Sequence, residues 1–236
     1  MKSFKEYLQE GINDKGIFKA VFLSGIPGSG KSYTINKISD GTFEPRIVNT
    51  DKMVEFIDPD NGKEFNRIIL DKSKVLTKSQ LLLFIDSMLP LVIDGTSSNA
   101  GNLIQRMAAL ESIGYDIAMV WVNTDVETAI KRAAARERNV DADFIKRVND
   151  KSGENKSFFK SKFSTFLEID NNDGELTNKV ITAAGKKMTS FFGSPIKNPI
   201  GKRNKQKLID TKEKFLIPSI FDKSTIAKKI NVWYKK

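Results

Sequence analysis

Eight consecutive residues, Gly25 to Ser32, have the types and spacing of a phosphate-binding loop. Their sequence, GIPGSGKS, fits the pattern G-x-x-x-x-G-K-[ST] at every specified position. Glycines let successive backbone N–H groups point at one anion. In this pattern Lys31 reaches the β- and γ-phosphates, and the Ser32 hydroxyl ligates Mg²⁺. The sequence therefore predicts a nucleotide site, formed by Gly25, Pro27, Gly28, Ser29, Gly30, Lys31, Ser32 and Tyr33.

The segments that flank this loop place it between a strand and a helix. Residues 17–23 are mostly apolar, and residues 33–39 are compatible with a helix. Strand, loop and helix in this order are the context that the motif requires, and the helix adds the positive end of its dipole. The alternative is a glycine turn that binds nothing, which this context disfavours.

Two aspartates follow later segments that are expected to form strands. Asp51 comes just after residues 46–49, and Asp94 ends the apolar run 89–93. Parallel sheets bind their ligands at the carboxyl ends of their strands. A strand that ends in a carboxylate is typical of the second nucleotide motif, in which the Asp lies beside Mg²⁺. In the alternative interpretation, Asp94 only caps the next element.

Two arginines lie four residues apart in a segment that is expected to be helical. Arg132 and Arg136 therefore share a helix face. Near a phosphate loop, such a pair suits a lid that closes over the phosphate being transferred. The alternative is a solvated basic face, with ion pairs to Glu137 and Asp141.

Strand-like and helix-like segments alternate from residue 17 to residue 191, which predicts an α/β fold with a mainly parallel, five-stranded sheet between helices. The expected strands are residues 17–23, 46–49, 89–94, 115–122 and 165–170. The expected helices are residues 33–39, 64–88 with a potential break at 77–79, 101–113, 124–138 and 175–191.

Two residue types are missing from the composition. The chain has no cysteine and no histidine, which excludes disulfides, thiolate nucleophiles, Ser-His-Asp catalysis and sites that need Cys or His as metal ligands. Any general base must therefore be Asp, Glu or Lys. No apolar run approaches the roughly 20 residues that span a bilayer, and we expect no membrane partner.

The net charge of +10 is concentrated near the C-terminus. Residues 186–236 contain 14 Lys and Arg against 3 Asp and Glu, whereas the rest of the chain is nearly neutral. We therefore divide the chain into a catalytic domain at residues 11–192 and a basic C-terminal extension at residues 193–236, which begins with a basic linker. Basic segments bind polyanions, so the extension is a candidate DNA or RNA contact. The apolar residues 215–221 are expected to pack on the domain or on a partner.

From residue 17 to residue 191, the chain resembles the P-loop kinases that group phage-type polynucleotide 5′-kinases with zeta-toxin-like kinases. GIPGSGKS is the specific element, and Asn49-Thr50-Asp51, Asp94-Gly95-Thr96 and Arg132-x-x-x-Arg136 match further motifs. The resemblance implies a three-layer P-loop NTPase fold of the nucleotide-kinase type, with ATP and Mg²⁺ as cofactors.

The resemblance also implies roles for single residues. Asp51 is then the general base, Asp94 and Thr96 lie with it on the substrate side, Asp94 and Ser32 lie beside the metal, and Arg132 and Arg136 are lid arginines. In one position the chain departs from polynucleotide kinases, which place an arginine three residues after the base. Val54 stands there, so the resemblance leaves the acceptor open.

The first ten residues, MKSFKEYLQE, allow two interpretations. On residue physics alone they form a short amphipathic helix that docks on the domain. They also resemble the capsid-targeting leaders of internal head proteins in tailed phages, which a prohead protease cuts after Leu/Ile-x-Glu; here the cut would follow Leu8-Gln9-Glu10. That resemblance implies a protein of the virion interior that reaches the host cytoplasm, whereas the plain interpretation implies a cytoplasmic one.

The function that these observations favour is ATP-dependent transfer of a phosphoryl group to a hydroxyl of a nucleic-acid end, nucleotide or nucleotide-sugar. Two alternatives stay open. One is a DNA-associated protein of the virion interior whose P-loop domain is non-catalytic or regulatory. The other is a plain NTPase, which is disfavoured because the guanine-specificity pattern N-K-x-D is missing.

Overall fold

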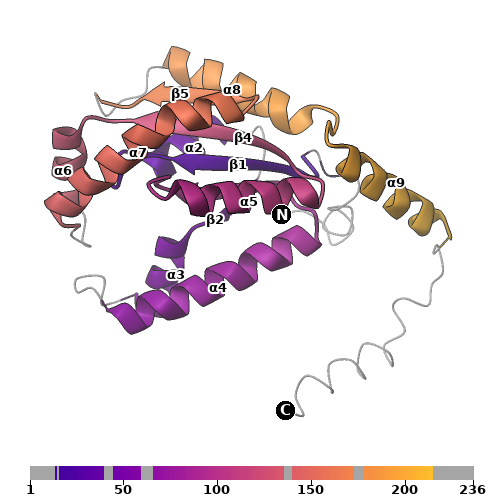
Figure 1. Cartoon of the computed structure of the whole chain (residues 1–236), viewed down its shortest axis with the longest axis horizontal. Coiled ribbons are helices and arrows are strands. Elements are labelled where there is room, and N and C mark those ends of the chain that lie inside the picture. The colour runs from indigo at the N-terminus through magenta and orange to yellow at the C-terminus, as the bar shows by residue number, and fades with distance from the viewer. Residues whose placement is uncertain are drawn as a thin grey trace, which may run out of the picture.

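A parallel five-stranded sheet forms the centre of the computed structural model, which describes residues 14, 16–39, 45–59, 66–135, 140–172 and 178–214 (Figure 1). The strands lie in the order β2-β3-β1-β4-β5, and all four pairings are parallel. The carboxyl ends of all five strands therefore meet at one edge of the sheet. The predicted α/β fold is confirmed. The strands are β1 (Lys19–Ser24), β2 (Arg46–Val48), β3 (Leu91–Gly95), β4 (Asp116–Asn123) and β5 (Phe166–Asp170).

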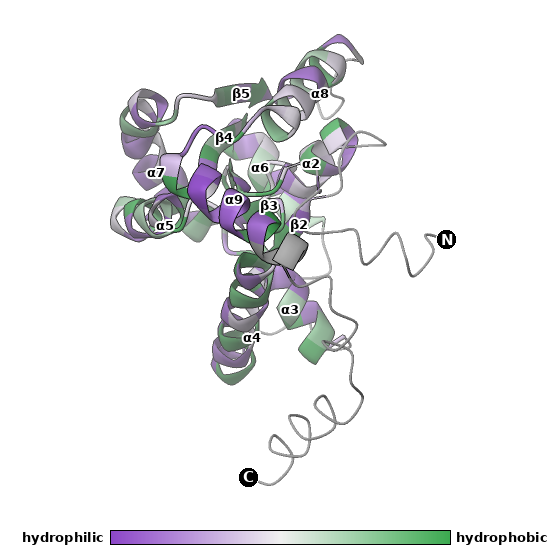
Figure 2. Ribbon diagram, turned by 90° about the vertical axis from the view of Figure 1, so that its right-hand side faces the viewer, coloured by the Kyte–Doolittle hydropathy of each residue, from purple (hydrophilic) through white to green (hydrophobic). Residues whose placement is uncertain are grey.

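Helices cover both faces of the sheet and make the fold three-layered. One face packs on α2 (Lys31–Ser39) and α8 (Asn178–Gly193), through an apolar cluster that includes Ile35, Ile38 and Met188. The other packs on α5 (Ala100–Ser112), α7 (Ala142–Lys162) and α4 (Arg67–Asp86). Figure 2 shows α2 and α8 on one side of the strands and α5 and α7 on the other. Helix α6 (Val126–Ala134) packs on α7 and on Ile26 of the phosphate loop.

The structure differs from the predicted elements at several places. It contains α3 (Thr50–Ile57) and α7, neither of which the sequence analysis predicted. Helix α4 continues through residues 77–79, and the Thr77 hydroxyl donates to the Ser73 carbonyl oxygen at 2.7 Å within the helix. The helix expected at residues 124–138 is α6, which begins only at Val126 because Asp125 caps it; the Asp125 carboxylate accepts from the Thr128 N–H.

The segment predicted to be a basic linker is folded. Residues 199–214 form α9 (Pro199–Lys214), and the residues before it are bound to the sheet. Buried Lys19 donates from Nζ to Asp116 Oδ2 at 2.6 Å, to Ser194 Oγ at 3.0 Å and to the Pro195 carbonyl oxygen at 3.1 Å. The side chain of Ile196 is buried in the core. The predicted packing of residues 215–221 lies outside the described residues, as does the leader.

Among the described residues, no helix combines the length with the apolar content that a bilayer span needs.

Candidate active site

The phosphate loop joins the end of β1 to the start of α2, as the motif requires. Its backbone needs glycine at two positions, because φ is +85° at Gly28 and +81° at Gly30. A Cβ atom at Gly28 would also collide with the carbonyl oxygen of Ala129 in α6, and one at Gly30 with the Asn171 side-chain amide. The loop is therefore shaped both by its own conformation and by the elements packed against it.

Lys31 and Ser32 open α2 at the positions where a nucleotide phosphate would lie. The Lys31 ammonium group donates to the carbonyl oxygens of Gly25 at 2.8 Å and Ile26 at 3.1 Å, so it is held over its own loop. Ser32 and Tyr33 are exposed at the start of the helix. This arrangement fits the phosphates of a nucleoside triphosphate, because backbone N–H groups, an ammonium group and a helix N-terminus all belong to the phosphate loop and the start of α2.

Two side chains that the sequence analysis missed support the loop from behind. The buried amide of Asn171 donates to the Ser29 carbonyl oxygen at 2.8 Å, and the Thr124 hydroxyl donates to the same oxygen at 3.2 Å. Asn171 directly follows β5, and Thr124 directly follows β4. The rule that located Asp51 and Asp94, a polar residue at or just after the carboxyl end of a strand, also applies to both of these residues.

Arg132 lies close to the phosphate loop but is engaged in a structural contact. Its guanidinium group donates from Nη1 to the Asn171 carbonyl oxygen at 2.7 Å and from Nη2 to the Asn172 carbonyl oxygen at 2.8 Å. It thereby fixes the segment after β5, from which Asn171 reaches Ser29. Arg132 is therefore connected to the phosphate loop through Asn171, which contacts both. Arg136 lies outside the described residues.

Asp94, Asn49 and Asp51 are brought together at the carboxyl ends of β2 and β3. Asn49 Nδ2 donates to Asp94 Oδ2 at 2.5 Å, and Asn49 Oδ1 accepts from the backbone N–H groups of Asp51 at 2.7 Å and Lys52 at 3.2 Å. One amide group therefore caps α3 and ties that helix to the end of β3. Sequence analysis included Asn49 in a motif but did not predict this bridge.

Burial dominates the electrostatics of Asp94. Desolvation raises the pKa of its carboxyl group, nearby Asp51 raises it further, and the Lys31 charge opposes both. Asp94 Oδ1 is buried without a hydrogen-bond partner among the described residues. A buried carboxylate oxygen without a donor needs a cation or a donor group to offset its desolvation, so Asp94 fits the side of the site where Mg²⁺ would be held.

Other metal sites have no support in the described ranges, where no three acidic side chains gather in one place. Where Mg²⁺ accompanies a nucleotide, it is usually held by the nucleotide phosphates, waters and one or two carboxylates of the protein. Ser32 and Asp94 match that limited contribution, because each lies at the end of an element that borders the loop.

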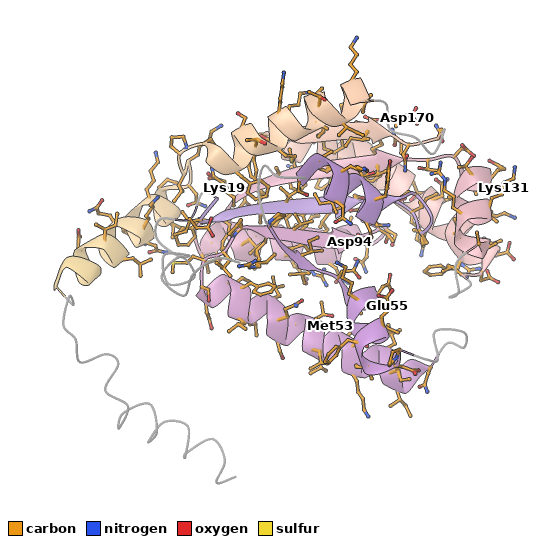
Figure 3. All side chains as sticks on the ribbon, turned by 180° about the vertical axis from the view of Figure 1, so that it is seen from behind. Lys19, Met53, Glu55, Asp94, Lys131 and Asp170 are labelled. Atoms are coloured by element: carbon orange, nitrogen blue, oxygen red, sulfur yellow. The ribbon has the colours of Figure 1, made fainter. Side chains whose placement is uncertain are left out.

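Thr96 lies two residues after Asp94, in the loop between β3 and α5. Its hydroxyl group lies 2.9 Å from Ser98 Oγ, and its carbonyl oxygen accepts from the Ser24 hydroxyl at 3.4 Å. Figure 3 shows Asp94 in the middle of the molecule, with α3, which carries Met53 and Glu55, on one side of it and α6, which carries Lys131, farther away. The site residues thus border a region between the phosphate loop, α3 and the β3–α5 loop.

Comparison with known protein families gives one match that covers most of the chain. Residues 8–194 match the zeta toxin family. The comparison with curated protein sequences gave no match.

Several solved structures have a similar fold. A putative kinase from Chloroflexus aurantiacus has a TM-score of 0.54 at 13% identity, and the match covers 74% of this chain and 98% of that one. The PezAT toxin–antitoxin system of Streptococcus pneumoniae gives 0.52 at 18% identity, covering 88% and 93%. The Pnkp1/Rnl/Hen1 RNA repair complex gives 0.50 at 19% identity, covering 64% and 48%. These similarities support the fold.

Proposed function

The chain belongs to the zeta toxin family, and we propose that it transfers the γ-phosphate of ATP to a hydroxyl of a nucleic-acid end, a nucleotide or a nucleotide-sugar. The observation that carries this proposal is the convergence of Lys31, Asp51 and Asp94, since the Asp94 carboxyl group feels the charges of both other residues. A cation for phosphate and a second carboxylate thus both lie within electrostatic reach of Asp94. No histidine or cysteine is needed for this reaction.

Phosphoryl transfer requires positioning and charge neutralisation more than covalent help from the protein. The loop N–H groups and Lys31 hold the β- and γ-phosphates. Asp51 accepts the proton of the acceptor hydroxyl, the hydroxyl oxygen forms a bond to the γ-phosphorus, and the bond between that phosphorus and the β–γ bridging oxygen breaks to leave ADP. Mg²⁺, when bound near Ser32 and Asp94, neutralises phosphate charge.

The two carboxylates suit different roles. Asp51 is exposed in the first turn of α3, where an acceptor can reach it. Asp94 is largely buried and accepts from Asn49 through one oxygen. We therefore assign proton transfer to Asp51, and Asp94 to the metal side. Arg132 and Arg136 remain our proposed lid arginines, and Arg132 would have to release the two carbonyl oxygens that it now holds.

The test of this proposal is incubation with γ-labelled ATP and a panel of hydroxyl acceptors. The panel contains nucleosides, nucleoside 3′-phosphates, oligonucleotides with a 5′-hydroxyl and nucleotide-sugars. We expect the label to move to at least one acceptor, and to stay on ATP when Mg²⁺ is removed by a chelator. Release of inorganic phosphate alone across the whole panel would instead identify a plain NTPase, and binding without turnover would identify a regulatory domain.

Replacing Asn49 by alanine is expected to lower turnover roughly 10-fold or more, because small misplacements of catalytic groups are costly. The change removes both the α3 cap and the Asp94 contact. Asn66→Ala is the matched control, since Asn66 caps α4 in the same way, accepting from Ile68 and Ile69 N–H groups. Both variants should lose about 1 kcal/mol of unfolding free energy in urea, and equal turnover in both would exclude the positioning role.

A nucleic-acid acceptor would have a second contact in α9. Lys202, Arg203 and Lys207 are exposed on this helix. Changing all three to glutamine is expected to weaken binding to single-stranded DNA and to reduce the slope of log K against log salt by about 2. The charge-matched control changes the exposed lysines Lys72, Lys78 and Lys151. The same slope in both variants would show that α9 charge is only a solvated surface.

The leader proposal concerns residues 1–10, which lie outside the described residues. The family match begins at residue 8, and the sheet begins at Lys19. A cut after Glu10 would therefore leave every strand intact. We retain as a proposal that a prohead protease removes the leader and that the protein travels in a phage head to the host cytoplasm.

A further inference from the structure

A pocket of about 160 Å³ lies beside Asp94, on the α5 side of the sheet. Its apolar part comes from strand residues such as Phe22 and Ile93. Its polar part comes from Asp94 and Thr96, and from two residues of α5, Asn102 and Arg106. The volume is sufficient for a small anion and water, but not for a whole nucleotide. The phosphate loop is a separate set of residues, so this pocket is not the nucleotide-phosphate site.

The loop that walls the pocket is held in a conformation that the chain does not adopt readily. Ser97 has a φ of +56°, which is unusual for a residue other than glycine. The amide of Asn155 in α7 donates to the carbonyl oxygens of Ser97 at 3.0 Å and Ser98 at 3.4 Å. A strained backbone held by its surroundings is common at ligand sites. Here the two hydrogen bonds from Asn155 hold the loop in this conformation in the ligand-free protein.

Arg106 brings a positive charge to this pocket. Its side chain is exposed, and no carboxylate pairs with it in the described part of the chain. Asp94, the acidic residue among those lining the pocket, is bound to Asn49 through Oδ2. A guanidinium group stays ionised at all physiological pH values and binds phosphate through two parallel hydrogen bonds. The N-terminal end of α5, which begins at Ala100, adds a favourable dipole at the same pocket.

We propose that this pocket holds an anionic group of the phosphate acceptor, bound by Arg106, so that the acceptor is a phosphate-bearing alcohol. This inference rests on the proposed kinase function, because it assumes that the acceptor lies between Asp51 and the β3–α5 loop. The acceptor then spans the site, with its hydroxyl at the carboxylates and its own phosphate at Arg106. All three acceptor classes proposed above carry such a phosphate.

The test measures binding to the full chain saturated with ADP, so that the nucleotide site is already filled. The probes are cytidine 3′-phosphate and uridine 5′-phosphate, each compared with its phosphate-free counterpart, cytidine or uridine, by titration calorimetry. We expect at least one phosphate-bearing probe to bind about 10-fold more tightly than its counterpart. Arg106→Ala should remove that preference and leave the Kd for ADP unchanged, while Arg106→Lys should retain part of it.

Arg67→Ala is the matched control, because Arg67 is an exposed arginine of α4 and its loss changes the net charge equally. It should keep the full preference, and thermal unfolding should show that all variants are folded. The inference is overturned if neither phosphate-bearing probe is preferred, or if Arg106→Ala keeps the preference.

The labelled-ATP assay separates this inference from the proposed function. Phosphate transfer that continues in Arg106→Ala with an unchanged KM for the acceptor would overturn the pocket assignment and leave the kinase proposal standing. Binding that depends on Arg106, without any transfer by the wild type, would overturn the kinase proposal and leave the anion pocket standing.

Discussion

Lys31→Ala is expected to lower phosphoryl transfer by at least about 10²- to 10³-fold, the usual effect of removing one preorganised charge-stabilising donor. The ammonium group of Lys31 donates to the carbonyl oxygens of Gly25 and Ile26 in its own loop, and Lys31 is not a member of the apolar cluster beneath α2. The fold should therefore survive. Transfer of label from γ-labelled ATP and thermal unfolding of the same preparation measure the two effects.

Lys37→Ala is the matched control for this prediction. Lys37 lies in the last turn of the same helix, is exposed, and stacks its ammonium group over the Tyr33 ring at 5.9 Å. Its loss changes the net charge by the same amount at a place away from the phosphates. We expect wild-type transfer from this variant. Equal activity in Lys31→Ala and Lys37→Ala would remove the enzyme hypothesis.

The sheet and the phosphate loop were predictable because each is encoded locally. All six residues of β1 are buried, and the four residues from Ala20 to Leu23 form the apolar run that marks the strand. Helix α7 was missed because its buried side chains are few, at Ile145, Val148, Ser152 and Phe159, and Gly153 lies within a mostly polar sequence. Its inward face is recognisable only once the sheet to which it packs is known.

The start of α9 had a signal that was interpreted wrongly. Asn198 caps this helix by accepting from the Ile200 N–H at 2.9 Å, and Pro199 is its first residue. Asn followed by Pro is a helix start as well as a turn signal, and the basic composition favoured the linker interpretation. The residues before α9 are held against the sheet by Asp116. Its carboxylate accepts from Lys19 Nζ and from the Lys197 and Asn198 N–H groups.

The site residues at the carboxyl ends of strands could be predicted from the sequence. Residues whose side chains bind backbone groups of other segments were harder to predict. Asp94 lies near the carboxyl end of β3, Asp51 lies just beyond β2, and the two carboxylates interact, as expected. The contacts of Arg132 are two backbone carbonyl oxygens, which leave no trace in the pattern of side chains. The Asn49 bridge likewise depends on a backbone path that brings β2 beside β3, a pairing set by the sheet order.

Asparagine substitutions at Asp51 and Asp94 should separate the two carboxylates. Asp51→Asn is expected to lower transfer by roughly 10²-fold or more, the usual contribution of a general base, while ATP affinity stays near the wild-type value. Asp94→Asn should also lower transfer, but with a raised Mg²⁺ requirement, because Asp94 lies on the proposed metal side. Transfer rates and ATP affinities measured across a Mg²⁺ titration distinguish the two results.

The Asp94→Asn substitution should raise the stability of the protein although it lowers activity. Its pKa is raised in the folded protein, mainly by burial, so folding favours the protonated acid and the wild type loses stability as pH rises through the folded pKa. The isosteric Asp94→Asn variant cannot ionise and can still accept from Asn49. Ligand-free Asp94→Asn should therefore have a larger free energy of unfolding than the wild type at pH 7.

The same difference should disappear in acid, below the ordinary pKa of an aspartate, where Asp94 is protonated in both the folded and the unfolded chain. Urea unfolding of both proteins at several pH values measures it. Asp51 is exposed, and Asp51→Asn serves as the control because no buried charge is removed there. If Asp94→Asn is less stable than the wild type at neutral pH, then the neighbours of Asp94 already stabilise its ionised form. In that case Asp94 Oδ1 is not a ligand position for a cation.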